Sequence, residues 1–412
     1  MEFMMKQEIV IPRREKLLNS LKELDAVILF AEREAKLEKF KQDNNFLYLT
    51  GLNAPNAIYF GFKSGNGNRE YLFIQRNDPE RVVWEGKKLE VEEARERSGI
   101  NNVIYLDEFE AMLSMFCPMI NRIYSNIGQQ ELNAPISYAM FRLQPVRERY
   151  PQIAIQCVTE VISPLRKVKD DWEIMQLQRA IDVTGKGIID ILETAGAGMM
   201  EYELEALLFY RIQRSGLKHW GFAPIIASGV NATTLHYEKN ECQIASNDLV
   251  LMDVGASYMN YSADISRTFP VNGTFTERQK QVYSAVLRVQ KEIIEMIAPG
   301  VKLSELQVKA RDLIAGELIE LGLIKHAAEV TKYYMHGVSH FLGMDTHDVG
   351  GREAILEPGN VITVEPGIYI PEESIGVRIE DDVLVIEEGY CVLSQNIPKE
   401  IDELEEILKG RQ

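Results

Sequence analysis

Short apolar runs alternate with helical patterns in the N-terminal part of the chain. Apolar positions in RREKLLNSLKEL, residues 13–24, recur at helical spacing, and DAVILF, residues 25–30, follows as a buried strand. A second helix is expected over residues 79–99, with Gly99 near its end. Gly, Asn and charged residues separate further strand candidates, which are residues 44–52, 57–62, 69–74, 101–106 and 121–127. This alternation predicts an α/β domain.

The pattern changes at VISPLRKVKDDWE, residues 161–173, where Pro164 marks a boundary. Because 412 residues exceed one ordinary core, we expect two domains, 1–163 and 164–412. In the second, strand-like segments are interspersed with long helical patterns over residues 170–195, 198–216, 276–300 and 302–322. Two of these helices begin with apparent capping boxes, formed by the pairs Thr276–Gln279 and Ser304–Gln307.

The helix pairs of the second domain resemble each other. The Ile, Leu, Gly and Glu positions of residues 191–204 recur with the same spacing in residues 293–306. A match this short can arise by chance. If it reflects a duplication, two similar halves meet across a pseudo-two-fold axis, and a site would lie between them.

Charge and composition exclude several classes of protein. The formal net charge of −17 and the scattered Lys and Arg residues argue against nucleic acid or an anionic membrane as a partner. Four widely separated cysteines indicate a reducing compartment rather than a disulfide framework or a zinc ribbon. The chain start lacks the apolar region of a signal peptide, and no run approaches the roughly 20 apolar residues of a membrane span. We therefore expect a cytoplasmic protein.

Two aspartates flank one predicted hairpin in LVLMDVGASYMNYSADISRTF, residues 249–269. Asp253 follows an apolar run, and Asp264 comes after the turn-rich segment GASYMN. An aspartate at a strand end is usually a solvated cap. Asp is nevertheless disfavoured inside strands, so a pair that could share one face needs an explanation.

Two glutamates occupy similar positions further along. Glu365 ends an apolar run before Pro366–Gly367, and Glu380 lies in GVRIEDDVLVI, two residues after Arg378. Either glutamate alone would usually be a surface residue paired with Lys or Arg. Their combination with two aspartates in β-rich segments indicates a carboxylate-rich site.

HGVSHFLGMDTHD, residues 336–348, holds three of the chain's six histidines. His336 and His340 have the spacing of the HExxH zinc helix, but the Glu is missing and Gly337 weakens a helix. Ser339 lies in GVSHF, which is not the GxSxG of a nucleophile elbow. With His236 and His347, these histidines lie near the carboxylate-bearing segments.

Four carboxylates and one or more imidazoles form a hard, oxygen-rich donor set. Such a set favours Mn²⁺, Co²⁺, Fe²⁺ or Mg²⁺ over a thiolate zinc site. Two divalent ions would neutralise the four carboxylates and could support hydrolysis. The residues alone therefore predict a dinuclear metallohydrolase.

These motifs resemble those of the pita-bread metallopeptidases, the family of methionine aminopeptidase, aminopeptidase P and prolidase. The resemblance spans about residues 165 to 400, and the family's ligand order falls on Asp253, Asp264, His340, Glu365 and Glu380. It implies an α+β pita-bread catalytic domain with two metal ions, Mn²⁺ first, with Co²⁺, Fe²⁺ or Zn²⁺ as alternatives.

The resemblance also assigns roles. Asp253 would chelate one ion, Asp264 and Glu380 would bridge both, and His340 and Glu365 would complete the other. A bridging hydroxide would be the nucleophile, and Glu365 would move its proton. With Glu365, His236 and His347 would be catalytic, because they would touch the substrate and stabilise the tetrahedral intermediate. His336 and Arg378 would support the metal site, and Tyr369 would line the pocket.

The N-terminal motif NNFLYLTGLNAPNAIYF resembles the creatinase-type α/β domain of aminopeptidase P and prolidase. Creatinase itself lacks the metal ligands. VVWEGKKL resembles an aminopeptidase P segment whose tryptophan reaches the active site of a neighbouring subunit. Trp84 is therefore a candidate substrate-binding residue donated across the interface of a homo-oligomer, a dimer or tetramer. Packing of Trp84 within its own domain is the equal alternative.

Both remaining subfamilies cleave bonds that precede proline. The expected activity is removal of the first residue from peptides with proline in second position, with Xaa-Pro dipeptidase (prolidase) as the alternative. Long prolidases carry an Arg-bearing insertion before the first motif glutamate, and Arg352 is the sole candidate here. A scaffold of the same fold that binds peptides without catalysis is the third hypothesis.

Overall fold

The computed structural model describes residues 5, 7–34, 39–128 and 133–410. The chain divides into two compact units, Met1–Leu165 and Arg166–Gln412. The division falls inside helix α7 (Thr159–Lys167), which also contains Pro164, the expected boundary residue.

The first unit is built on a six-stranded mixed sheet in the order β4-β3-β2-β1-β5-β6. The strands are β1 (Asp25–Phe30), β2 (Ile58–Phe62), β3 (Arg69–Ile74), β4 (Asn102–Tyr105), β5 (Arg122–Ser125) and β6 (Ala154–Cys157). The helices are α1 (Gln7–Ser20), α2 (Asn44–Thr50), α3 (Pro79–Glu85), α4 (Val91–Ser98), α5 (Phe109–Phe116) and α6 (Tyr138–Arg149). This is the predicted α/β arrangement.

Both faces of this sheet are covered, because side chains of a strand alternate between them. Ile28 of β1 and Phe60 of β2 join a core cluster with Phe109 of α5 and Leu143 of α6. On the opposite face α1 packs so closely that a Cβ on Gly61 would lie 2.9 Å from the Leu18 side chain.

Two local predictions for this unit are wrong. Residues 44–52 were expected as a strand but form α2, because the Asp43 carboxylate accepts a hydrogen bond from the Phe46 amide (2.7 Å) and Gly51 ends the helix at φ 68°. The helix expected over 79–99 is interrupted: Gly86, at φ 80°, ends α3, and α4 begins at Val91.

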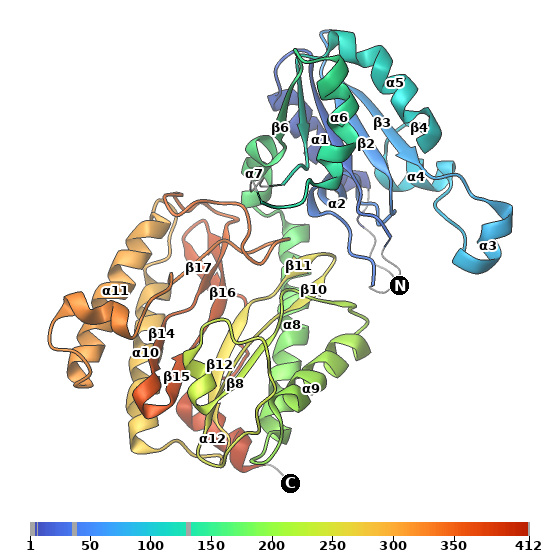
Figure 1. Ribbon diagram of the computed structural model, residues 1–412. Coiled ribbons are helices and arrows are strands. Elements are labelled where there is room, and N and C mark those ends of the chain that lie inside the picture. The colour runs from blue at the N-terminus through green and yellow to red at the C-terminus, as the bar shows by residue number, and fades with distance from the viewer. Residues whose placement is uncertain (1–4, 6, 35–38, 129–132, 411–412) are drawn as a thin grey trace. The chain divides into compact units, whose positions relative to one another are not determined.

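The second unit combines helices with small antiparallel sheets, an α+β arrangement. Its helices are α8 (Asp171–Thr194), α9 (Glu201–Arg214), α10 (Glu277–Glu295), α11 (Leu303–Glu320) and α12 (Ile401–Lys409). One sheet has the order β12-β9-β8 and another β13-β16-β17, and β14 pairs with β15. Figure 1 shows these strands between the α8–α9 pair and the α10–α11 pair.

The strands of this unit are β7 (His219–Trp220), β8 (Ile225–Ser228), β9 (Leu249–Val254), β10 (Ala256–Tyr258), β11 (Tyr261–Ser262), β12 (Ile265–Pro270), β13 (Val361–Val364), β14 (Gly367–Ile370), β15 (Ile375–Arg378), β16 (Asp381–Ile386) and β17 (Gly389–Val392). Hydrophobic residues of β9, β12, β13 and β15 are buried. The strand ends can therefore present polar side chains in a largely dry environment.

The helix pairs repeat a backbone detail as well as a sequence pattern. Gly198 and Gly300 precede α9 and α11 with φ of 91° and 92°. Two residues after each glycine, an isolated antiparallel bridge forms, Met200 with Gln243 and Lys302 with Ile355. This agreement supports the internal pseudo-symmetry expected from the sequence.

One of the two predicted capping boxes is present. The Gln279 amide donates to Thr276 Oγ1 (3.3 Å), and the Thr276 amide donates to Gln279 Oε1 (2.9 Å). The Ser304 cap is wrong, because α11 begins earlier, with Lys302 as its N-cap and the Lys302 amide donating to Glu305 Oε2 (3.1 Å). No helix among the described residues is both long and apolar enough to cross a membrane.

Replacing Gly376 with alanine should destabilise the second unit. A Cβ there would lie 2.0 Å from the Ala232 carbonyl oxygen, and backbone cannot yield as a flexible side chain can. We expect a loss of about 1–3 kcal/mol in the free energy of unfolding, measured by denaturant titration. Gly316→Ala is the control: that site in α11 has open space, so it should gain about 1 kcal/mol from helix propensity. Equal changes in the free energy of unfolding for the two variants would contradict the close approach of Gly376 to the Ala232 carbonyl.

Candidate metal centre

The two aspartates come from the β9–β12 pair. Asp253 lies near the end of β9, opposite Ser266 of β12, and Asp264 directly precedes β12. The Asp264 amide donates to Asp382 Oδ2 (3.2 Å), which holds this turn against β16. Burial raises the pKa of Asp264 and the Asp253 carboxylate raises it further, so the two carboxyl groups lie within electrostatic reach of each other.

The two glutamates enter from the β13–β16 sheet. Val364 pairs with Asp381, so Glu365 and Glu380 lie just beyond paired strand ends. The Glu365 amide donates to the Val338 carbonyl (2.9 Å), and the Glu380 amide donates to the Ser266 carbonyl (3.1 Å). Backbone hydrogen bonds thus fix both glutamates.

His340 completes the cluster. Its amide donates to Thr363 Oγ1 (3.2 Å), and its Nδ1–H donates to the Phe341 carbonyl (3.0 Å). Nε2 is therefore the nitrogen that remains available to bind a metal ion. It lies 3.3 Å from Asp264 Oδ2 and 3.5 Å from Glu365 Oε1.

The donor set fits a divalent cation. Ligand atoms of Asp264, His340 and Glu380 all lie within 4.8 Å of one another. Within the described part of the chain, the buried Oδ1 of Asp253 has no hydrogen-bond partner. Burial raises the pKa of Asp264 and Glu380 well above their ordinary values, and neighbouring carboxylates raise both further. Crowded carboxylates of this kind need a cation to be ionised together.

Glu365 has a raised pKa that bears on proton transfer. Burial raises its pKa to about 7, against the opposing effects of His340 and Arg378. A carboxyl group with this pKa can hold or release a proton near neutral pH.

Arg378 supports the cluster from β15. Its Nη2 donates to Asp253 Oδ2 (2.7 Å) and its Nε donates to Ser266 Oγ (2.8 Å). Ser266 Oγ in turn donates to Glu380 Oε2 (2.9 Å). One buried guanidinium therefore orients two carboxylates.

Arg378 also begins a chain of hydrogen bonds. Its Nη1 donates to the Tyr369 hydroxyl (3.0 Å), and that hydroxyl donates to His336 Nε2 (2.8 Å). His336 Nδ1–H donates to the Gly337 carbonyl (2.7 Å), which assigns the tautomer. Burial and the nearby Arg378 together lower the pKa of His336 to about 4, so this imidazole is neutral near pH 7.

The remaining predicted residues are more exposed. His347 lies beside the metal ligand candidate His340, with ring centroids 4.4 Å apart. Burial lowers the pKa of His347, as do His340 and His236, so His236 lies within electrostatic reach. His236 is exposed, and so is Trp84, which belongs to α3 of the first unit and is 87% exposed. Trp84 and the cluster therefore belong to different units.

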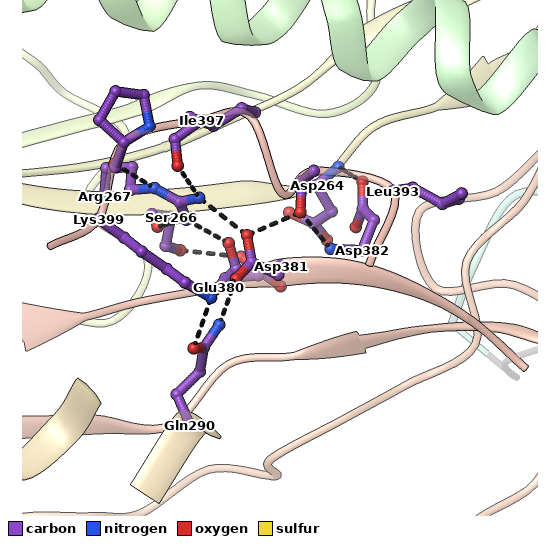
Figure 2. Close-up of polar contacts among 12 residues, drawn as sticks. Asp264, Ser266, Arg267, Gln290, Glu380, Asp381, Asp382, Leu393, Ile397 and Lys399 are labelled. Carbon is purple, nitrogen blue, oxygen red and sulfur yellow. Dashed lines mark hydrogen bonds and ion pairs between the residues drawn. The ribbon is translucent and has the colours of Figure 1, made fainter. Parts of the chain in front are cut away.

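Sequence reasoning missed a second layer of charge beneath the cluster. Figure 2 shows Asp381 between Arg267 and Lys399, with Gln290 also donating to it. Arg267 Nη1 donates to the Glu380 carbonyl (2.5 Å) and to the Ser266 carbonyl (3.0 Å). The signal was the run of three acidic residues after Ile379, since charges are rare in a buried strand.

Comparison with known proteins identifies the family. The family model for metallopeptidase family M24 matches residues 175–387, and the model for the aminopeptidase P N-terminal domain matches residues 10–124. The chain belongs to metallopeptidase family M24. An M24 metallopeptidase is a hydrolase that requires divalent metal, and the cluster described above is a possible site for it.

Full-length relatives support this membership of the M24 family. The chain is 32% identical to Xaa-Pro aminopeptidase of Haemophilus influenzae and 31% identical to that of Escherichia coli, over 96% of each chain. It resembles the structure of Zn-substituted E. coli aminopeptidase P in complex with product at a TM-score of 0.92 and 30% identity, over 99% of each chain. The predicted fold class is thereby confirmed: an N-terminal creatinase-like α/β domain and a pita-bread catalytic domain.

Removing metal should make the M24 peptidase lose stability as pH rises. The pKa of Glu365 in the metal-free fold, about 7, exceeds its ordinary value of 4.5, so the protonated form stabilises the fold. This contribution is complete below pH 4.5 and disappears as the pH rises through about 7. The melting temperature of EDTA-treated protein should therefore fall between about pH 5 and about pH 8, and Mn²⁺ should suppress the fall.

The control for this experiment is Glu365→Gln, which cannot titrate and should flatten part of the slope. Equal slopes with and without metal would show that the cluster does not hold the ion.

Proposed function

We propose that the chain is an Xaa-Pro aminopeptidase, a dinuclear-metal exopeptidase that removes the N-terminal residue from peptides with proline in second position. The observation that carries the proposal is the convergence of four carboxyl groups and one imidazole from separate strands. The E. coli and H. influenzae relatives carry the same activity in their names. All the predicted ligand positions are occupied by residues able to bind metal.

Asp253 would hold one ion, Asp264 and Glu380 would bridge both, and His340 and Glu365 would complete the other. Oxygen-rich ligands favour Mn²⁺, with Co²⁺, Fe²⁺ or Zn²⁺ as alternatives. When bound, the ions would polarise the scissile carbonyl and lower the pKa of a water molecule. Arg378 keeps Asp253 oriented, since its guanidinium donates to Asp253 Oδ2 and so leaves Oδ1 available.

Side chains of the protein carry out proton transfer and substrate binding. Glu365 accepts the proton of the attacking water and passes it toward the leaving amine, because it is the cluster carboxylate whose Oε1 lies beside His340 Nε2 (3.5 Å). His347, whose pKa is lowered, is neutral at pH 7 and donates an N–H to the peptide. His236 contacts the substrate from the opposite loop, and His336 with Tyr369 keeps the pocket wall rigid through their hydrogen bond.

The protein should act as a homo-oligomer, a dimer or tetramer, in the cytoplasm. Its four cysteines are free thiols, as expected in a reducing compartment. Trp84 and Val83 are 87% and 83% exposed on α3, a degree of exposure that favours a contact with another subunit over packing in the same domain. Arg352, the candidate for capturing a dipeptide carboxylate, is exposed in a turn.

The substrate class is tested by offering Mn²⁺-loaded protein Xaa-Pro dipeptides and Xaa-Pro-Xaa tripeptides. We expect release of the first residue from the tripeptides and no cleavage of matched Xaa-Ala-Xaa peptides. Chromatography of the products measures both outcomes. Cleavage restricted to dipeptides would instead assign the protein as a prolidase. Failure to cleave any of these peptides would favour the hypothesis of a scaffold that binds peptides without catalysis.

Glu365→Ala should abolish turnover without unfolding the protein. Loss of a general base typically lowers kcat by roughly 10²–10⁴-fold, and loss of a ligand adds to that. Glu372→Ala is the matched control, because Glu372 is an exposed glutamate on η5 (Pro371–Glu373) and should leave kcat unchanged. Retained activity in Glu365→Ala would mean that another group moves the proton.

A further inference from the structure

The loop that carries His236 connects β8 to β9. It begins at Ser228, passes through the 3₁₀ turn Gly229–Thr233, and returns at Cys242. The imidazole of His236 is exposed, yet its neighbours Leu235 and Tyr237 pack against a cluster that contains Tyr369, whose hydroxyl is hydrogen-bonded to Arg378 and His336. The loop must therefore hold His236 close to the metal cluster without burying it.

Glu201 accepts hydrogen bonds from the start, the middle and the end of this loop. It is fully buried. The donors to Oε1 are the Ser228 amide (2.7 Å), Ser228 Oγ (2.7 Å) and Asn231 Nδ2 (3.1 Å), and the donors to Oε2 are the Tyr237 hydroxyl (2.8 Å) and the Cys242 amide (2.9 Å). A buried carboxylate is costly unless it is fully hydrogen-bonded. Every donor that offsets this cost belongs to the one loop.

Helix α9 supplies two further constraints. Glu201 is its first residue, where the helix dipole favours negative charge. One turn later, Glu205 Oε2 accepts from Asn240 Nδ2 (2.9 Å), and Asn240 Oδ1 accepts from the Ile226 amide (2.9 Å). The first two turns of α9 thus anchor both sides of the His236 loop to a rigid element.

The neighbours of His236 face inward. Leu235 and Tyr237 pack against a buried cluster made by Ile225, Ala227, Ala232, Leu251 and Tyr369. His236 stands between these two anchored residues with its side chain exposed. Tyr237 therefore links the imidazole to the Glu201 carboxylate through one peptide unit and one hydrogen bond.

We propose that Glu201, acting through Tyr237, is a positioning residue that sets the place of the His236 imidazole at the active site. This inference rests on the proposed function, in which His236 contacts the substrate. Glu201 touches neither substrate nor metal, so its effect on catalysis passes through His236. Metal affinity should not depend on it.

A double-mutant cycle on the Mn²⁺-loaded enzyme tests the link. Tyr237→Phe removes only the hydroxyl and should lower kcat for an Xaa-Pro-Xaa peptide by roughly tenfold, the size typical of supporting partners. In a His236→Ala background the same change should have no further effect, because the group that Tyr237 positions is already gone. Glu201→Gln should lower kcat more, since an amide nitrogen would face donors.

The matched control is Glu203→Gln. Glu203 also lies in the first turn of α9, but its carboxylate accepts from the Met200 amide (2.7 Å) outside the loop. It should leave kcat unchanged. A Tyr237→Phe effect of equal size with and without His236 would overturn the proposal, because a purely structural role gives additive losses.

A second measurement does not need a substrate. In Zn²⁺-loaded protein with labelled histidine, the His236 resonance, assigned by its loss in His236→Ala, should shift in Tyr237→Phe. His326, exposed next to η4 (Ala327–Lys332), should not shift. An unmoved His236 signal would overturn the positioning role, whereas a shifted signal in a protein that cleaves no Xaa-Pro peptide would support it and refute the proposed function alone.

Discussion

Mutual repulsion among buried carboxylates is the constraint on which the second unit depends. Asp264 and Glu380 are almost fully buried; burial raises the pKa of both, Asp253 raises that of Asp264 further, and Asp264 raises that of Glu380 further. Without a cation such a cluster is ionised only at a cost in folding free energy, so the fold and its metal are thermodynamically linked. The surrounding structure reflects this constraint. One guanidinium, that of Arg378, lies on the Asp253 side, and the charge of Arg267 is committed to Asp381.

Arg378 and Arg267 neutralise different carboxylates, and this division matters for metal binding. Arg267 and Lys399 neutralise Asp381, whose pKa they hold below its ordinary value against the effect of burial. Asp381 directly follows Glu380 in the chain, but its carboxylate is bound by Arg267 and Lys399 and therefore does not compete for the metal. The three consecutive acidic residues have different partners: Glu380, just before β16, accepts from Ser266 Oγ, Asp381 accepts from Arg267 and Lys399, and Asp382 accepts from the Asp264 amide. Figure 2 shows these residues together.

The sequence predicted the four carboxylate candidates because each stands beside a β-rich run, a place where a carboxylate is conspicuous, and the resemblance to the pita-bread metallopeptidases added His340. Glu201 escaped notice, since a glutamate in the first turn of a helix is ordinary and its partners lie up to 41 residues away. Residues 44–52 misled for the opposite reason: their aromatic and β-compatible composition outweighed a cap, Asp43, that only the folded backbone reveals. Local patterns report burial well, and they report long-range hydrogen bonding poorly.

The tautomer of His340 is set by the carbonyl of the next residue, Phe341, and not by a side chain. In many metal sites a carboxylate from elsewhere in the fold performs this task, and a single substitution can remove it. Here the orienting partner is main chain and is encoded by backbone geometry alone. A substitution of the Phe341 side chain therefore leaves the orienting acceptor in place, and the same nitrogen continues to face the ligand cluster.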